Sequence, residues 1–206
     1  MTGTEPGDIG RRVFGDRLPQ AKAYADRLAT VGIERGLLGP REAERVWDRH
    51  VLNSVAVAGL LPEGASVADI GSGAGLPGIP LAILRPDLTV TLVEPLLRRS
   101  TFLTETVAEL GLGERVRVER ARAEELEERF DVVVSRALAP LDRLAGWCRP
   151  LVAAGGMVLA IKGRSAADEV SSHEATLRKL GLTADVLTVT ADPDLEPTYA
   201  VRLVTT

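Results

Sequence analysis

A glycine-rich segment is the feature of this sequence with the clearest chemical meaning. A short apolar run over residues 67–70 leads into Gly71, Gly73, Gly75 and Gly78, and an apolar stretch with helical spacing follows. Glycine allows the main chain to approach a ligand closely, and open α/β sheets bind ligands at the carboxyl ends of their strands. The segment therefore predicts a site for a nucleotide-like ligand.

Two carboxylates bear on the identity of that ligand. Residues 73–78 match the dinucleotide pattern G-x-G-x-x-G, and Glu94 follows nineteen positions after Gly75, close to where such sites carry an acid for the ribose. Asp69 would repel a pyrophosphate, whereas S-adenosylmethionine has no phosphate and carries an ammonium and a sulfonium group. Asp69 thus favours S-adenosylmethionine, and Glu94 would accept hydrogen bonds from ribose hydroxyls with either ligand. A nicotinamide oxidoreductase stays an alternative.

The elements that must position these residues alternate between strand and helix. Strand-like runs at 66–70, 89–93, 115–118, 131–135 and 156–161 alternate with helical stretches near 78–85, 96–111, 123–129, 139–149 and 166–180. This order predicts an α/β fold with a doubly wound, mostly parallel sheet. The runs 183–190 and 198–205 predict an antiparallel C-terminal hairpin that completes seven strands.

Residues 1–62 are expected to form a helical N-terminal extension, with apolar residues at helical spacing over 21–31 and 41–61. Residues 63–206 are expected to form the ligand-binding domain, in one compact unit with the extension. No internal repeat or long linker interrupts this plan. Within the extension, Arg41, Arg45 and Arg49 recur every four residues, so that on an α-helix they would share one face suited to phosphates.

Composition excludes several classes of protein. A single Cys148 among 206 residues rules out a disulfide framework and a cysteine-based zinc cluster, and no metal is expected. The absence of an apolar run of about 18 residues and of a signal peptide predicts a cytoplasmic protein.

The net charge of −4 argues against a nucleic-acid partner. However, residues 165–206 hold 3 basic and 7 acidic residues and so carry the whole acid excess, which leaves the rest free to present basic patches.

Five collinear stretches extend the pattern beyond the glycines. They are Arg49-His50-x-x-Asn53-Ser54, the run from Asp69 to Ala82, Arg122-Ala-Glu124, Val134-Ser-Arg136-Ala137 and Leu159-Ala-Ile-Lys162-Gly163. Together they resemble the small-subunit ribosomal RNA guanine-N7 methyltransferases, also called the glucose-inhibited division protein B family. The sequence departs from that pattern at Gly36-Leu37-Leu38, where many relatives have Asn-Leu-Thr, and at Asn53, which replaces a common Asp.

The resemblance implies a class I, Rossmann-like methyltransferase that uses S-adenosylmethionine. Its substrate would be N7 of a guanine in 16S ribosomal RNA (guanine 527, in the 530 loop), and its partner 16S RNA or the small ribosomal subunit, bound by a monomer. Donor contacts would come from Gly71, Leu76, Ala123, Glu124 and Arg136, beside the Asp69, Gly73, Gly75 and Glu94 considered above. The catalytic face would hold His50, Arg136 and Lys162.

The residues themselves agree with this chemistry. Guanine N7 already presents a lone pair, so its methylation needs no general base. Cytosine C5 methylation needs a cysteine nucleophile, and Cys148 falls inside a helical stretch; Ser135-Arg136-Ala137 stands where adenine-N6 enzymes place Asx-Pro-Pro. Beside the nicotinamide oxidoreductase, three further alternatives stay open: a methyltransferase acting on a small molecule or protein, a non-catalytic donor-binding module, and a purely structural His50.

Overall fold

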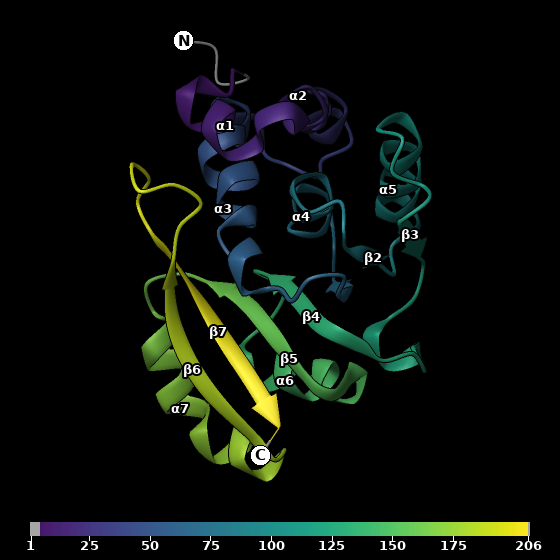
Figure 1. Ribbon diagram of the computed structural model, residues 1–206. Helices are drawn as coiled ribbons and strands as arrows, with labels where there is room; N and C mark the ends of the chain where they lie inside the picture. Colours follow the sequence, from purple (N-terminus) through teal and green to yellow (C-terminus); the bar gives the residue numbers. More distant parts are fainter. Residues whose placement is uncertain (1–4, 206) are drawn as a thin grey trace.

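Seven strands form one mixed sheet in the computed structural model, which describes residues 5–205 (Figure 1). The strands are β1 (Ser66–Ile70), β2 (Thr89–Val93), β3 (Val116–Glu119), β4 (Phe130–Arg136), β5 (Val152–Lys162), β6 (Leu182–Val189) and β7 (Thr198–Thr205). Their order is β3-β2-β1-β4-β5-β7-β6. The first five run parallel, and β7 pairs antiparallel with both β5 and β6. The predicted fold class is confirmed.

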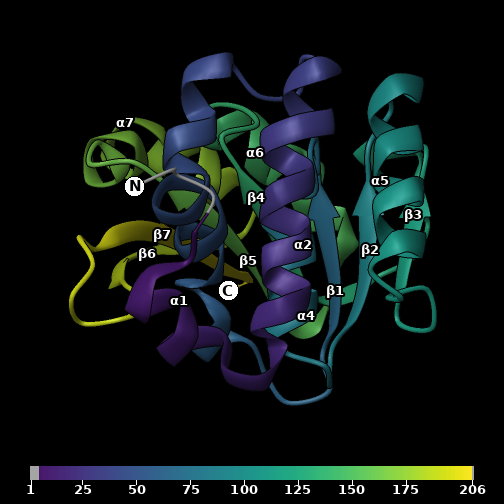
Figure 2. The same cartoon turned by 90° about the horizontal axis from the view of Figure 1, so that it is seen from above.

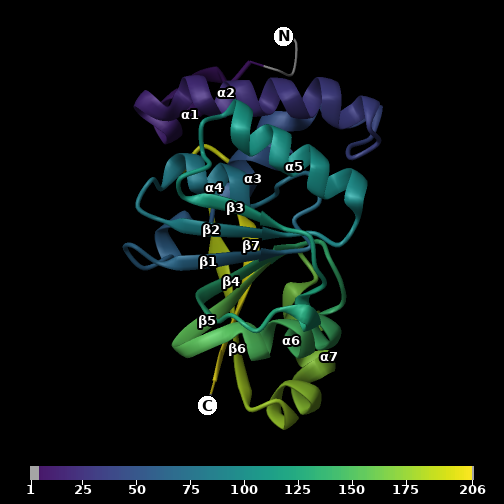
Figure 3. The same ribbon diagram turned by 90° about the vertical axis from the view of Figure 1, so that its right-hand side faces the viewer.

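Helices cover both faces of this sheet (Figures 2 and 3). One face carries α1 (Gly7–Phe14), α2 (Leu18–Arg27), α3 (Asn53–Val55), α4 (Gly78–Leu84) and α5 (Leu97–Glu109), and the other α6 (Leu141–Cys148) and α7 (Ala166–Lys179). Because side chains alternate along a strand, Val132 and Val134 of β4 enter the first hydrophobic cluster, and Val133 enters the second. The N-terminal helices therefore share one core with the sheet.

The N-terminal region contains several short turns of unequal pitch. The 3-10 and π segments are η1 (Gly15–Arg17), η2 (Leu28–Gly32), η3 (Pro40–Arg45), η4 (Val46–Leu52) and η5 (Ala58–Leu60). The stretch 41–61 is helical as expected, but it is divided into short 3-10, π and α segments. The π segment η4 buries Trp47 and His50 together with Val51, and the Trp47 ring meets Phe14 of α1 edge to face, 6.1 Å between centroids. Burial against α1 and the sheet thus overrides regular helical spacing.

The helix expected over 123–129 is wrong. Only the single 3-10 turn η6 (Ala123–Glu125) forms there, and a second such turn, η7 (Arg149–Leu151), follows α6. Four glutamates fall within 124–128, and like charges at neighbouring helical positions destabilise a helix. The Glu125 carboxylate accepts a hydrogen bond from the Arg122 amide, which closes the turn.

None of the helices in residues 5–205 combines the length and hydropathy needed to cross a membrane.

Candidate active site

The glycine loop leaves the carboxyl end of β1 in a conformation that favours glycine. Gly71, Gly73 and Gly75 have φ values of +70°, +60° and +96°, which side chains of L-residues rarely allow. The amides of Gly71 and Ser72 donate to the carbonyl of Val93 at 3.0 and 3.1 Å, so the loop bends over the end of β2. A Cβ at position 75 would overlap the Ile79 side chain. The main chain therefore forms the surface of this loop.

Asp69 lies beneath the loop and is fully buried. Its Oδ2 accepts hydrogen bonds from the Ser72 hydroxyl at 2.6 Å and from the Gly78 amide at 3.0 Å. Its Oδ1 is buried, with no hydrogen-bond partner among the described residues. Burial raises the pKa of Asp69 to about 6, despite these two bonds. One oxygen thus supports the loop, and the other is left for a cationic group.

Glu94 fixes the same loop from the end of β2. Its Oε2 accepts from the Gly73 amide and its Oε1 from the Leu96 amide, both at 3.0 Å, and the side chain is buried. Each carboxylate oxygen has a second lone pair that could accept a ribose hydroxyl. Ala123 and Glu124 lie in η6 beyond the neighbouring strand β3, with Ala123 buried and Glu124 exposed.

These groups fit S-adenosylmethionine. A Cβ at position 73 would meet only the Gly71 carbonyl oxygen, at 3.8 Å, which leaves space beside the loop for a ligand. The free Oδ1 of Asp69 suits an ammonium group. Leu138 covers Gly71 in this structure, since a Cβ at position 71 would overlap the Leu138 side chain. The Leu76 side chain is buried in the core, so only its main chain could contact a donor.

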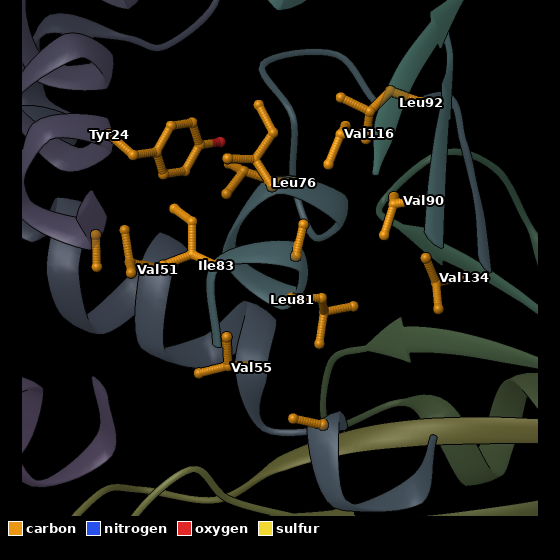
Figure 4. Packing of buried hydrophobic residues seen from close by; sticks show 14 of the residues in the cluster. Tyr24, Val51, Val55, Leu76, Leu81, Ile83, Val90, Leu92, Val116 and Val134 are labelled. Carbon is orange, nitrogen blue, oxygen red and sulfur yellow. The ribbon is translucent and has the colours of Figure 1, made fainter. Parts of the chain in front are cut away.

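Tyr24 of α2 also supports the glycine loop, a role that the sequence did not reveal (Figure 4). Its hydroxyl donates to the carbonyl of Ala74 at 2.8 Å, and the ring is fully buried. Burial raises the pKa of Tyr24 well above its usual value, so the hydroxyl keeps its proton. The N-terminal region therefore contacts the ligand loop directly.

A cavity of about 850 Å³ lies at the carboxyl ends of β4 and β5. Residues 37–56, the ends of β4 and β5, and residues 189–198 contribute to its wall. Arg45 and Arg49 line it, and Arg41 is not part of the lining. The predicted stripe of three arginines is therefore divided, because the chain passes from the 3-10 helix η3 into the π helix η4 between these positions.

His50 and Arg136 meet in this wall, as the resemblance implied. Arg136 Nη2 lies 2.7 Å from His50 Nδ1, and Nη1 donates to the Arg49 carbonyl at 2.9 Å. His50 Nε2 lies 2.7 Å from Glu42 Oε2. Glu42 was missed by sequence reasoning, since nothing in its local spacing relates it to a residue 94 positions later. Both ring nitrogens of His50 are thus engaged.

Lys162 lines the same cavity as this pair, but its ammonium group is bonded elsewhere. Side chains alternate along β5, and Lys162 follows Val158 and Ala160, which face α6 and α7. Its Nζ donates to the Ala139 carbonyl at 2.9 Å and to Glu169 Oε1 of α7 at 2.8 Å. The same Glu169 oxygen accepts from the Leu141 amide. Lys162 therefore anchors the loop after β4, the loop that carries Leu138.

The two departures from the family pattern fall in different places. Gly36 has φ +65°, a conformation that glycine and asparagine adopt more easily than other residues, so the exchange for Asn is compatible with this backbone. Asn53 lines the cavity.

Cys148 is buried at the end of α6, and burial raises the pKa of its thiol to about 12.

Comparisons with known proteins identify the family of this chain. A family model described as rRNA small subunit methyltransferase G (GidB) matches residues 17–195. The chain is 58% identical over 201 residues to "Ribosomal RNA small subunit methyltransferase G" of Nocardioides sp., covering 96% of this chain and 80% of the relative. It is 59% identical over 183 residues to a protein of the same name from Mycobacterium avium, covering 86% and 74%.

Two solved structures show the fold alone, because their sequence identities are low. A precorrin-6y C5,15-methyltransferase from Geobacter metallireducens aligns with a TM-score of 0.56 at 15% identity, over 83% of this chain and 92% of that one. TYW2 of M. jannaschii, in complex with AdoMet, aligns with a TM-score of 0.56 at 16% identity, over 73% of each chain.

Proposed function

This chain belongs to the family of ribosomal RNA small subunit methyltransferases G, and from that premise we propose that it methylates N7 of a guanine in 16S ribosomal RNA. The family site, guanine 527 in the 530 loop, is the proposed target. The observation that carries the proposal is the cavity of about 850 Å³ at the carboxyl end of the sheet, with Arg136 held in its wall by His50.

The chemistry of N7 suits the groups available in this wall. N7 presents a lone pair in the plane of the base, so no proton has to be removed before it attacks a methyl group. Both nitrogens of His50 are occupied by Glu42 and Arg136. Cys148, the sole cysteine, is buried with a raised pKa and is unsuited to nucleophilic attack. The enzyme's task is therefore to position the reactants and exclude water.

Arg136 is the proposed group for orienting the base. A guanidinium has five N–H donors, and only two of them are used by His50 and the Arg49 carbonyl. A remaining N–H donating to guanine O6 would hold the ring and leave N7 free; a bidentate grip on O6 and N7 would block the reaction. Lys162 is proposed to act indirectly, through the loop that it anchors.

S-adenosylmethionine, when bound, supplies an electrophilic methyl group on its sulfonium. The proposed donor contacts come from the glycine loop, the ends of β2 and β3, and Arg136: they are Asp69, Gly71, Gly73, Gly75, Leu76, Glu94, Ala123, Glu124 and Arg136. Asp69 Oδ1 would accept from the donor's ammonium group, and Glu94 would accept from the ribose hydroxyls. The adenine edge would meet the main chain of η6.

The RNA is proposed to approach over the cavity rim that carries Arg45 and Arg49. The ribosomal substrate places the proposed reaction in the cytoplasm, with a monomer acting on 16S RNA or on the small subunit. The names of the relatives favour RNA over the small molecule or protein that the sequence alone left open. Light scattering on the purified protein tests the monomer.

The test of this function is a methylation assay that locates the product. The protein is incubated with labelled S-adenosylmethionine and with small subunits from cells that lack the enzyme, in parallel with naked 16S RNA. Aniline treatment then cleaves the RNA at 7-methylguanosine, and primer extension maps the position. We expect one cleavage at the proposed guanine, absent with heat-inactivated protein. Label found only in protein or small molecules, or at another RNA position, would overturn the proposal.

A further inference from the structure

Three side chains from separate segments form a continuous hydrogen-bonded chain in the cavity wall. Glu42 comes from η3, His50 from η4 and Arg136 from the end of β4. Glu42 Oε2 lies 2.7 Å from His50 Nε2, and His50 Nδ1 lies 2.7 Å from Arg136 Nη2. His50 is 6% exposed, so its ring has little access to solvent. The chain connects the cavity rim to the group proposed to hold the base.

The direction of these hydrogen bonds follows from the donors available. Arginine carries donors and no acceptor, so His50 Nδ1 must accept from Arg136 and bears no proton. The one ring hydrogen therefore lies on Nε2, and it is donated to the Glu42 carboxylate. Burial and the charge of Arg136 lower the pKa of His50, and they outweigh the opposing effect of Glu42. The lowered pKa keeps the ring neutral. The tautomer of His50 is thus set by its two partners.

Glu42 also reaches the second residue that holds Arg136. Its Oε2 lies 3.3 Å from Arg49 Nε, and the Arg49 carbonyl accepts from Arg136 Nη1 at 2.9 Å. One carboxylate oxygen consequently contacts both residues that receive hydrogen bonds from the guanidinium. Burial opposes ionisation of Glu42, but the bond from His50 and the charge of Arg49 hold its pKa below the ordinary value.

We infer that Glu42 is a positioning residue for the methyl transfer: through His50 and Arg49 it fixes the plane of the Arg136 guanidinium. His50 in turn serves as a hydrogen-bond acceptor for Arg136 and exchanges no proton with the substrate. This inference rests on the proposed function, because it takes Arg136 as the group that contacts guanine. The role inferred for His50 differs from that of a catalytic histidine and from that of a histidine that only fills the core.

Kinetics of substituted proteins separate these roles. Loss of a partner that orients a functional group costs about tenfold to 100-fold in activity, so Glu42→Ala should lower kcat by about tenfold or more and leave the donor Kd nearly unchanged. Glu42→Gln keeps an acceptor oxygen for Nε2–H and should recover most of that loss. Glu44→Ala, an exposed residue of the same 3-10 helix, is the matched control and should behave as wild type.

Substitution of His50 tests the second half of the inference. His50→Asn places an amide oxygen near the position of Nδ1 and removes the titratable ring, whereas His50→Ala leaves Arg136 without this acceptor. We expect His50→Asn to keep at least about tenfold more activity than His50→Ala. Equal loss in both variants, at unchanged thermal stability, would identify acid-base chemistry and overturn the inference. Wild-type kcat in Glu42→Ala would overturn it as well.

A spectroscopic measurement needs no substrate and so stands apart from the proposed function. The sequence has two histidines, and His173→Gln, on the other face of the sheet, leaves His50 as the sole imidazole. Nitrogen-15 NMR of this protein should show a protonated Nε2 and an unprotonated Nδ1 near neutral pH. A protonated Nδ1 would contradict the inference even if methylation occurs, and failure of methylation with the expected tautomer would fault the proposed function alone.

Discussion

The donor loop and the cavity wall are built in different ways. Around the loop, main-chain amides and a few short contacts dominate: Asp69 binds Ser72 three residues on and Gly78 nine residues on, and Glu94 binds Gly73 from the adjacent strand. In the cavity wall, polar and charged side chains from distant segments hold one another, as the neutral His50 and Arg136 do across 86 positions. The first region depends on backbone conformation, and the second depends on side-chain hydrogen bonds.

This difference indicates where a substitution can alter function without altering folding. A substitution in the loop has to alter a buried backbone arrangement, so it should change donor affinity and stability together. A substitution in the wall removes a side chain that lines a cavity, so it should change turnover with little effect on folding. Four substitutions test this division, in order of decreasing effect.

Arg136→Ala should separate the two regions most clearly. Removing a hydrogen-bond donor that is aimed at the reacting group costs about 100-fold to 1000-fold in kcat, so turnover should fall by that order. The affinity for the methyl donor should fall by less than about tenfold. Single-turnover methylation of small subunits gives the first quantity, and calorimetry gives the second. Donor binding lost in proportion to turnover would show that Arg136 belongs functionally to the loop.

Asp69→Asn should weaken the binding of S-adenosylmethionine. The amide oxygen can still accept from Ser72 and Gly78, but the charge opposite the donor's ammonium is gone. Loss of a charged hydrogen bond costs about 1.5–3 kcal/mol, so donor Kd should rise by about tenfold to 100-fold. Calorimetry measures the change, and the kcat at saturating donor should stay near that of wild type.

The pKa of Asp69 gives this prediction a pH dependence. In the wild-type protein donor affinity should weaken as pH falls through about 6, because the carboxylate takes up a proton there. Stability of the free protein has the opposite sign: the folded pKa is raised, so ionisation of Asp69 destabilises the fold as pH rises from 3.8 to about 6. Asp69→Asn should show neither trend, and a lower Tm than wild type at neutral pH would contradict this account.

Tyr24→Phe tests whether the division is complete, since Tyr24 comes from the N-terminal region and yet supports the donor loop. The variant keeps the ring and loses the hydrogen bond to the Ala74 carbonyl. The expected cost is about 1 kcal/mol in stability, with donor Kd weakened a few-fold. Urea unfolding and calorimetry measure both effects. Altered turnover at unchanged donor affinity would assign Tyr24 to the cavity wall instead.

Arg12→Ala, outside both regions, should have the smallest effect. Arg12 pairs with the buried Asp192 at 2.8 Å and with the exposed Asp194 at 2.6 Å. Half of the Arg12 side chain is exposed, so solvent screens both pairs and they contribute little. A Tm lower by about 1–2 °C is expected. Arg12 lowers the pKa of Asp192 to about 2, so the difference from wild type should shrink as pH falls from 3.8 toward that value. Thermal melts across this range check the trend.

Sequence reasoning predicted the place of the glycine loop in the fold well, because the residues that determine it are contiguous. Strand, glycines and helix follow one another from 66 to 84, and parallel strands bring Glu94 to the same edge. The arrangement of the cavity wall was harder to predict from the sequence. The resemblance placed His50 and Arg136 on one face, but Glu42 gave no local signal, since its contacts depend on the 3-10 and π turns of η3 and η4.

Lys162 shows another limit of the sequence. The end of β5 was predicted correctly, but which face its last side chain takes depends on how burial is divided between the two helical layers. Val158 and Ala160 pack on the side of α6 and α7, and Lys162 follows them to Glu169. The helix expected over 123–129 failed for a local reason, because its glutamates repel one another.

The cavity also has a consequence for biosynthesis. Its wall includes residues 189–198, and the contact of Arg12 with Asp192 joins positions 180 apart. Proteins are made from the amino terminus onward, so a nascent chain can display the glycine loop and Arg136 well before the last strand leaves the exit tunnel. The cavity wall is complete only when the hairpin of β6 and β7 has been made and has folded against the rest of the chain. Until then, a partly made protein would lack one wall of this cavity.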